Sequence, residues 1–364
     1  MFPGVSGAQF NTTYDPVNRC SIYNNIGFFG SDMYYYLVNA VHVVVDTFTV
    51  ANPWNFYACA IAGNPTIVNP YTFDILNTVH TEVNHDLYVA PWGDDNNSGV
   101  SPSEPMRTIY NAVYKIASDS SNPKTVYVAN GTYSSSLNGQ IFPIPLKSYM
   151  NLVGESQDGT ILDAEYQDFI IYISAHSQSF NMSQLKLING KAGVMTSKGI
   201  DYTVDKVTIN SIVDIRLTMG FLGNKTQTAR LSNLTVSNVS SPQNATGVRF
   251  LAFTNSIEMT NVEISDCRSY NWMPTLEASA RGDSRFKMDG CRFYNNSNYS
   301  ADVFNTIMQV SPDYDYGQRL RIEIKNSAFY NNYQVMSAQM ANIRALNDTV
   351  FISNCTFADN SGGT

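Results

Sequence analysis

One short phrase recurs along most of this chain and limits the folds open to it. It reads apolar, any residue, Asn, apolar or Cys, any residue, apolar, and then a polar pair that often contains Asn. The clearest copies begin at Leu231, Met259, Met288, Ile324 and Ile352, and weaker copies surround Leu152, Leu185 and Val207. Most intervals lie in the twenties. Such a period predicts a solenoid, in which each repeat packs only on its neighbours.

The residues inside each repeat indicate which solenoid this is. Leucine-rich, ankyrin and tetratricopeptide repeats each need a helix-forming stretch, whereas these units are short β-rich runs broken by Asn, Ser and Gly. Only 14% of the residues are charged, while 23 Tyr and 19 Phe favour strands. We therefore predict an all-β chain built from coils of three short strands.

The Asn of the phrase is predicted to occupy a tight bend with positive φ. Asn and Gly tolerate that conformation best, and Gly290 replaces the Asn in one copy. Strands of adjacent coils lie about 4.8 Å apart, so the amides can bond up and down the stack. The predicted structural ladder consists of Asn151, Asn233, Asn261, Asn326 and Asn354.

Three upstream segments make the assignment more specific. They are Asp86–Ile109 (DLYVAPWGDDNNSGVSPSEPMRTI), Thr125–Tyr133 (TVYVANGTY) and Asn151–Glu165 (NLVGESQDGTILDAE). With the repeats, they resemble the right-handed parallel β-helix of the pectate-lyase-like superfamily, in its secreted bacterial surface type. The resemblance covers most of residues 86–364 and implies an extracellular or bacterial cell-surface location.

The resemblance also implies a short N-terminal capping helix, here about Met106–Ser118. Its apolar stripe would be Ala112, Val113, Ile116 and Ala117. A cap is needed because an uncovered solenoid end offers unpaired strand edges to other chains.

The first residues suggest a second unit. Residues 17–25 (VNRCSIYNN) repeat the phrase, with Cys20 and Ile22 in the inward positions. We expect residues 1–80 to hold the C-terminal coil of a preceding β-helix plus a β-rich spacer, and residues 81–364 to form a β-helix that is open at its C-terminus. The chain would then be a piece of a longer surface protein with flanking domains.

Several classes of partner are excluded. The net charge of -8 provides no cationic surface for nucleic acid, and no apolar run is long enough to span a membrane. The five cysteines lack metal or disulfide-framework spacing. Asp94–Asn97 could hold calcium, but runs of acid, amide and glycine residues are ordinary in turns. We predict no metal and no cofactor.

The strand after the Asn-rich turn is where the superfamily builds its substrate clefts. Its expected outward side chains and their neighbours, the substrate-binding candidates, are Arg249, Glu277, Gln309, Asp313 and Gln339. A β-helix lyase needs a base beside acidic groups, and a hydrolase needs paired carboxylates. This face offers one acid and one base, Glu277 and Arg249. They form either a catalytic or sugar-binding pair, or an exposed ion pair of little energetic value.

Elsewhere, Glu263 and Arg292 occupy equivalent positions one coil apart and are predicted to pair across the stack. Tyrosines such as Tyr299 and Tyr333 could stack on sugar rings if they are exposed.

The sequence thus predicts a non-enzymatic module, a stalk or adhesin-like element whose lateral face binds a polysaccharide, a cell-surface glycan or another surface protein. The alternative is a polysaccharide lyase or glycoside hydrolase with its cleft on the lateral sheet. In that case Glu277 and Arg249 are the catalytic candidates.

Overall fold

A computed structural model of the chain shows two compact units, Met1–Val83 and Asn84–Thr364. The structure describes residues 13–25, 32–37, 41–53, 56–62, 71–173, 179–196, 201–213, 219–222, 228–241, 248–253, 255–270, 274–280, 282–299, 306–312, 319–335, 341–344 and 347–362. No helix within these ranges is both long and apolar enough to cross a membrane.

The first unit contains two small parallel sheets. One has the order β1-β3-β5 and the other pairs β2 with β4, so successive strands alternate between the sheets. The strands are β1 (Cys20–Ile22), β2 (Met33–Leu37), β3 (Val41–Phe48), β4 (Ala58–Ala62) and β5 (Tyr71–Thr78). Cys20, expected to face inward, is exposed, and Ile22 is only half-buried. Their strand, β1, lies at the edge of its sheet and, among the described strands, pairs only with β3. That this unit ends a preceding β-helix stays a prediction.

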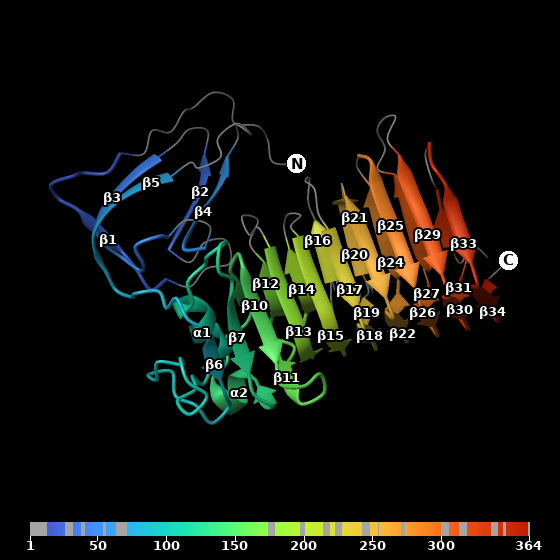
Figure 1. The fold of residues 1–364 in the computed structure, drawn as a ribbon, viewed down its shortest axis with the longest axis horizontal. Coiled ribbons are helices and arrows are strands. Elements are labelled where there is room, and N and C mark those ends of the chain that lie inside the picture. Colours follow the sequence, from blue (N-terminus) through green and yellow to red (C-terminus); the bar gives the residue numbers. More distant parts are fainter. Residues whose placement is uncertain are drawn as a thin grey trace. The chain divides into compact units, whose positions relative to one another are not determined.

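The second unit is a stack of parallel coils (Figure 1), which confirms the predicted fold. Its largest sheet has 17 strands, because β13 and β15 run through a bend and join two walls. The strands before that bend are β6 (Leu87–Val89), β7 (Lys124–Val128), β10 (Met150–Gly154), β17 (Thr228–Ser232), β21 (Ser256–Thr260), β25 (Ser284–Asp289), β29 (Leu320–Lys325) and β33 (Val350–Ser353).

The two continuous strands are β13 (Ser179–Ile188) and β15 (Asp201–Asn210). The strands after the bend are β8 (Gly131–Tyr133), β11 (Thr160–Asp163), β18 (Thr235–Ser237), β22 (Glu263–Ser265), β26 (Arg292–Tyr294), β30 (Ala328–Tyr330) and β34 (Thr356–Ala358).

Two further sheets close the coils. The five-stranded sheet contains β19 (Ser240–Ser241), β23 (Arg268–Ser269), β27 (Ser297–Asn298), β31 (Tyr333–Gln334) and β35 (Ser361–Gly362). The eight-stranded sheet contains β9 (Ile144–Leu146), β12 (Phe169–Ile173), β14 (Ala192–Thr196), β16 (Met219–Leu222), β20 (Val248–Phe253), β24 (Leu276–Ala280), β28 (Met308–Pro312) and β32 (Ala341–Ile343).

The core consists of continuous columns of inward side chains, one residue from each coil. One column contains Leu231, Met259, Met288 and Ile324, all fully or almost fully buried. In another, Phe293 and Phe329 stack with ring centroids 5.0 Å apart, and Phe329 and Phe357 stack at 4.8 Å. Burying such side chains stabilises each coil only against its neighbours, as expected for a solenoid.

The capping helix is present but shorter than predicted. Helix α1 spans Ile109–Lys115. Its N-cap residue is Thr108, whose side chain accepts a hydrogen bond from the Asn111 amide. Ala112, Val113 and Ile116 are fully buried, so the predicted apolar stripe faces the core, while Ala117 is half-buried. A second, four-residue helix, α2 (Ser135–Asn138), was not predicted.

The first bend follows the predicted left-handed pattern in the five clearest repeats. Asn233, Asn261, Asn326 and Asn354 have φ of 49°, 52°, 50° and 50°, and Gly290 has φ of 68°. The Asn261 amide donates to Asn233 Oδ1 (3.4 Å), and that of Asn354 donates to Asn326 Oδ1 (2.7 Å). Gly290 interrupts this ladder, and Asn326 bonds Asp289 Oδ1 instead (2.8 Å).

Asn151 does not belong to this column. It lies within β10. On successive coils, Leu152 is in register with Met182, Met182 with Val204, and Val204 with Leu231, which is the first residue of its copy of the phrase. Its copy of the phrase is therefore displaced toward the strand that precedes the bend. The Asn151 side chain instead donates to Thr125 Oγ1 (3.2 Å) and accepts from the Asn181 amide (2.7 Å) in a separate short ladder.

A second ladder lies inside the coils, at a second bend. There Asp266, Asn295 and Asn331 take positive φ, and the residue that follows each of them points inward. The buried Asn296 donates to Asn332 Oδ1 (3.1 Å), and the buried Asn332 donates to Asn360 Oδ1 (2.9 Å).

The inner ladder also holds the backbone. Asn296 Oδ1 accepts from the Cys267 amide (3.1 Å), and Asn332 Oδ1 accepts from the Asn296 amide (3.0 Å). Asn332 Nδ2 bonds the Phe293 carbonyl (3.0 Å) as well. One asparagine side chain thereby satisfies buried groups of adjacent coils that would otherwise lack partners.

Replacing Asn332 with Leu should lower the free energy of unfolding by about 3 kcal/mol, because buried donors and acceptors on both sides lose their partner. Chemical denaturation followed by far-ultraviolet circular dichroism measures this. The control is Asn181→Ala, an exposed asparagine that should cost under about 1 kcal/mol. Equal losses for the two variants would contradict the proposed importance of the inner ladder.

Gly290→Asn should leave stability within about 0.5 kcal/mol of the wild type, whereas Gly290→Val should lose about 2 kcal/mol, since Asn tolerates positive φ and a β-branched residue does not. A Cβ at this position would lie 2.6 Å from the movable Asn261 Oδ1. Thermal melts compare the two variants. Equal melting temperatures would show that the bend does not demand this conformation.

Candidate functional site

Three of the predicted site residues lie in one outward row on the eight-stranded sheet. Arg249 on β20 is in register with Glu277 on β24, and Glu277 with Gln309 on β28. Asn342 on β32 continues the row. Asp313 and Gln339, the other two candidates, fall outside the described residues.

Arg249 and Glu277 form an ion pair that is largely withdrawn from solvent. Arg249 Nε lies 2.5 Å from Glu277 Oε2, and the two side chains are 15% and 10% exposed. The sequence interpretation of an exposed pair is therefore wrong, because alternation along a strand places a residue outward but does not show what covers it. Burial raises the pKa of the Glu277 carboxyl, and the neighbouring Arg249 lowers it in part.

Gln309 does not join this pair. Its recorded hydrogen bond runs along its own strand, from Nε2 to Ser311 Oγ at 3.5 Å. Among the described positions from Gly220 to Asn342, this row carries one carboxylate, and Arg249 is committed to it. The arrangement is a salt bridge, and it lacks the second acid that hydrolysis by paired carboxylates uses.

The predicted Glu263–Arg292 pair, on the wall that follows the first bend, is present. Arg292 Nη2 lies 2.7 Å from Glu263 Oε2, but its side chain is 62% exposed. Tyr294 donates to the other oxygen of Glu263 (2.6 Å), and this hydrogen bond raises the pKa of Tyr294. Tyr294 also stacks on Tyr330 at 5.1 Å. These contacts join adjacent coils.

Exposed tyrosines gather at the edge of the five-stranded sheet, where three of them form what we call the tyrosine stripe: Tyr270, Tyr299 and Tyr333. The Tyr270 and Tyr299 rings stack with centroids 5.2 Å apart, and Tyr299 and Tyr333 are 5.9 Å apart. Their exposed fractions are 49%, 42% and 38%.

The planes of Tyr270 and Tyr299 are 19° apart, whereas the ring of Tyr333 is tilted by 52° to that of Tyr299. Within the described part of the chain, no hydrogen bond is recorded for these three hydroxyls. The sequence analysis names Tyr299 and Tyr333 as sugar-stacking candidates but does not include Tyr270. Its position one repeat before Tyr299 is the signal that could have found it.

Nothing in the described ranges gathers three or more potential metal ligands. Asp94 and Asp95 instead serve local structure. Asp94 Oδ1 accepts from the Asn96 amide (3.0 Å), and this bond lowers the pKa of Asp94. Asp95 accepts from the Thr108 amide at the start of α1 (2.9 Å). Burial raises the pKa of the Cys267 thiol to about 12 and of Cys291 to about 11, so both thiols are structural.

Parallel coils, left-handed bends and a capping helix define the fold class of this chain, a right-handed parallel β-helix. Residues 92–218 match the model of a family described as a protein of unknown function, DUF1565. No curated protein matches the chain.

Among solved structures, three pectin methylesterases are similar. The enzyme from carrot is 10% identical, with 74% of this chain and 89% of that chain covered and a TM-score of 0.36. The enzyme from Aspergillus niger is 14% identical, covering 78% and 87%, with a TM-score of 0.34. PemA from Erwinia chrysanthemi is 12% identical, covering 71% and 80%, with a TM-score of 0.32. With TM-scores below 0.5, these likenesses carry no argument about activity.

Arg249→Met should destabilise the protein by about 3 kcal/mol at pH 8, because it leaves a buried carboxylate without its cation. The matched control is Arg292→Met in the exposed Arg292–Glu263 pair, which should cost under about 1 kcal/mol. Denaturation midpoints compare the two, and equal losses would contradict the burial of the Arg249–Glu277 pair.

The same variant should change how stability depends on pH. The pKa of Glu277 is higher in the folded protein than its ordinary value of 4.5, so the folded state binds the proton more tightly than the unfolded state. This proton linkage contributes its full stability below pH 4.5, and the contribution is lost as pH rises through the folded-state pKa. Removing Arg249 raises that pKa further. Arg249→Met should therefore lose more stability than the wild type between pH 5 and pH 8, and adding Glu277→Gln should abolish the difference.

Proposed function

We propose that this protein is a non-enzymatic β-helix module of the bacterial cell surface or its surroundings, and that it binds polysaccharide along its side. The observation that carries the proposal is the tyrosine stripe. Its rings lie on adjacent coils and are 49%, 42% and 38% exposed. A polymer lying along the coil axis would meet one phenol after another.

The chemistry of the stripe suits a sugar chain. A tyrosine combines an apolar ring with a polar hydroxyl, and pyranose residues likewise combine apolar C–H faces with hydroxyl groups. The rings support one another at 5.2 and 5.9 Å, so little side-chain entropy is lost on binding. The stacked coils also provide a rigid support, as a stalk or adhesin-like element requires.

An alternative is a polysaccharide lyase or glycoside hydrolase that uses Arg249 and Glu277. The observation in its favour is the raised pKa of the Glu277 carboxyl, since shifted pKa values gather at catalytic sites. Against it, Arg249 and Glu277 are only 15% and 10% exposed and are engaged with each other. Structural ion pairs shift pKa values by the same physics, so we favour the binding module.

Affinity electrophoresis of the full chain in gels containing neutral and acidic polysaccharides, with and without calcium, tests the proposal. At least one polymer should retard the wild-type protein. The triple variant Tyr270→Ser, Tyr299→Ser, Tyr333→Ser should bind that polymer at least 10-fold more weakly. The control is Tyr127→Ser, which removes a tyrosine of similar exposure, 39%, from the outer face of β7 and should bind normally.

The same samples are assayed for unsaturated products and for reducing ends, and neither should appear. Unchanged binding by the triple variant would overturn the proposed role of the stripe. Product release that Glu277→Gln abolishes would establish the enzyme instead.

A further inference from the structure

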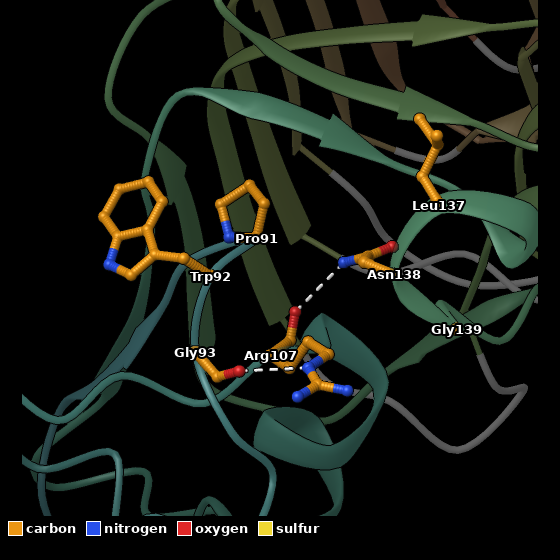
Figure 2. Close-up of a pocket in the computed structure, with 7 residues that line it drawn as sticks. All are labelled: Pro91, Trp92, Gly93, Arg107, Leu137, Asn138 and Gly139. Atoms are coloured by element: carbon orange, nitrogen blue, oxygen red, sulfur yellow. Dashed lines mark hydrogen bonds between the residues drawn. The ribbon is translucent and has the colours of Figure 1, made fainter.

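A hollow of about 400 Å³ lies at the capped end of the β-helix, away from both the tyrosine stripe and the Arg249 row. The turn after β6, which carries Trp92 and Gly93, forms one side, and α2 with the residue that follows it forms the other. Figure 2 shows Trp92 and Leu137 on either side, with Arg107 and Asn138 between them. A hollow of this size suits one small-molecule ring.

Trp92 is a large aromatic residue that lies largely uncovered at this hollow. Its side chain is 73% exposed, and no ring contact is recorded for it with any residue that the structure describes. Leu137, across the hollow, is 70% exposed. Large apolar side chains that flank a concave surface in this way provide the apolar part of a ligand site.

Arg107 is the only charged residue that lines the hollow, and it is held in place. Its Nε donates to the Gly93 carbonyl (3.0 Å), its own carbonyl accepts from Asn138 Nδ2 (3.1 Å), and its amide donates to Asp95 Oδ1 (3.0 Å). In the described part of the chain, no partner is recorded for its two terminal nitrogens. A fixed guanidinium with free terminal nitrogens is suited to bind a carboxylate or sulfate through two parallel hydrogen bonds.

The surrounding residues keep this geometry. A Cβ on Gly93 would lie 2.3 Å from the Met106 carbonyl oxygen, so only glycine allows the turn to approach so closely. Asp94 is one acid that could compete for Arg107: the Asn96 amide is the main cause of its lowered pKa, and Arg107 contributes as well. Its Oδ1 is engaged by both nitrogens of Asn96 (3.0 and 2.9 Å), and no ion pair within 4.0 Å joins Asp94 to Arg107 among the described residues.

We propose that this hollow binds an anionic pyranose, a sugar ring with a carboxylate or sulfate substituent. The ring would lie against the indole of Trp92, and the anionic group would pair with the terminal nitrogens of Arg107. The site does not depend on the tyrosine stripe, and either can fail without the other.

The test uses the full chain labelled with ¹⁵N and follows the indole N–H signal of Trp92, assigned with Trp92→Phe. The probes are the methyl glycosides of glucose, glucuronic acid and glucose 6-sulfate, which differ only at C6. Glucuronide or 6-sulfate should shift the Trp92 signal with a dissociation constant at least 10-fold lower than that of the glucoside. Comparing the two charged probes shows which anion the site prefers.

Arg107→Gln keeps a donor for the Gly93 carbonyl but removes the charge. It should reduce the preference for the charged probes at least 10-fold. Arg321→Gln, an exposed arginine on β29, is the matched control and should bind as the wild type does. Trp92→Ala, followed by calorimetry, should weaken all three probes. The proposal is overturned if the wild type binds the charged probes no better than the glucoside, or if Arg107→Gln retains the preference.

Discussion

The left-handed bend is the constraint on which the rest of this structure depends. Parallel strands can stack into continuous columns only if every coil turns at the same place, and a turn this tight requires positive φ. Asn233, Asn261, Asn326 and Asn354 meet that requirement at one bend, with Gly290 in place of the fifth Asn. At the next bend the residue that follows the left-handed one points inward, and there Asn296 and Asn332 join adjacent coils through buried amides.

The architecture could be predicted because these constraints are local and leave a repeated pattern. Positive φ restricts a position to Asn, Gly and a few others, and most inward positions on the strands are apolar, so both constraints appear in the sequence. Asn151 was misplaced because the phrase contains two inward positions three residues apart, and a weak copy can be aligned to either. The inner ladder was missed because the second Asn of each pair resembles one more turn residue, although Asn296 and Asn332 are fully buried.

The candidate sites depend on contacts between distant parts of the chain, and the sequence predicted them less well. Strand alternation identified Arg249, Glu277 and Gln309 as one outward row, but it could not predict that the first two would be covered. Tyr270 and Tyr299 follow equivalent positions on adjacent coils, but Tyr333 is in register with Ser297. Its ring contact with Tyr299 therefore could not be predicted from the repeat. The hollow beside Trp92 lies between a turn and a short helix that are distant in the sequence, and no sequence motif predicted it.

These features give a single account of the chain's surface. Two outward pairs on the described walls, Arg249–Glu277 and Arg292–Glu263, join adjacent coils and support the stack. Among the described residues, the groups that we propose for a partner are the tyrosine stripe at one edge and the Trp92–Arg107 hollow at the cap. Both suit recognition of sugars more than their cleavage.

The most direct test of this account is a crystal structure of the chain with a bound oligosaccharide, cut from whichever polymer it binds best. The account predicts sugar residues along Tyr270, Tyr299 and Tyr333, within hydrogen-bond distance of their hydroxyls, with the Arg249–Glu277 salt bridge intact. An oligosaccharide seated on the eight-stranded sheet, with Glu277 released from Arg249 and directed at a glycosidic bond, would contradict it.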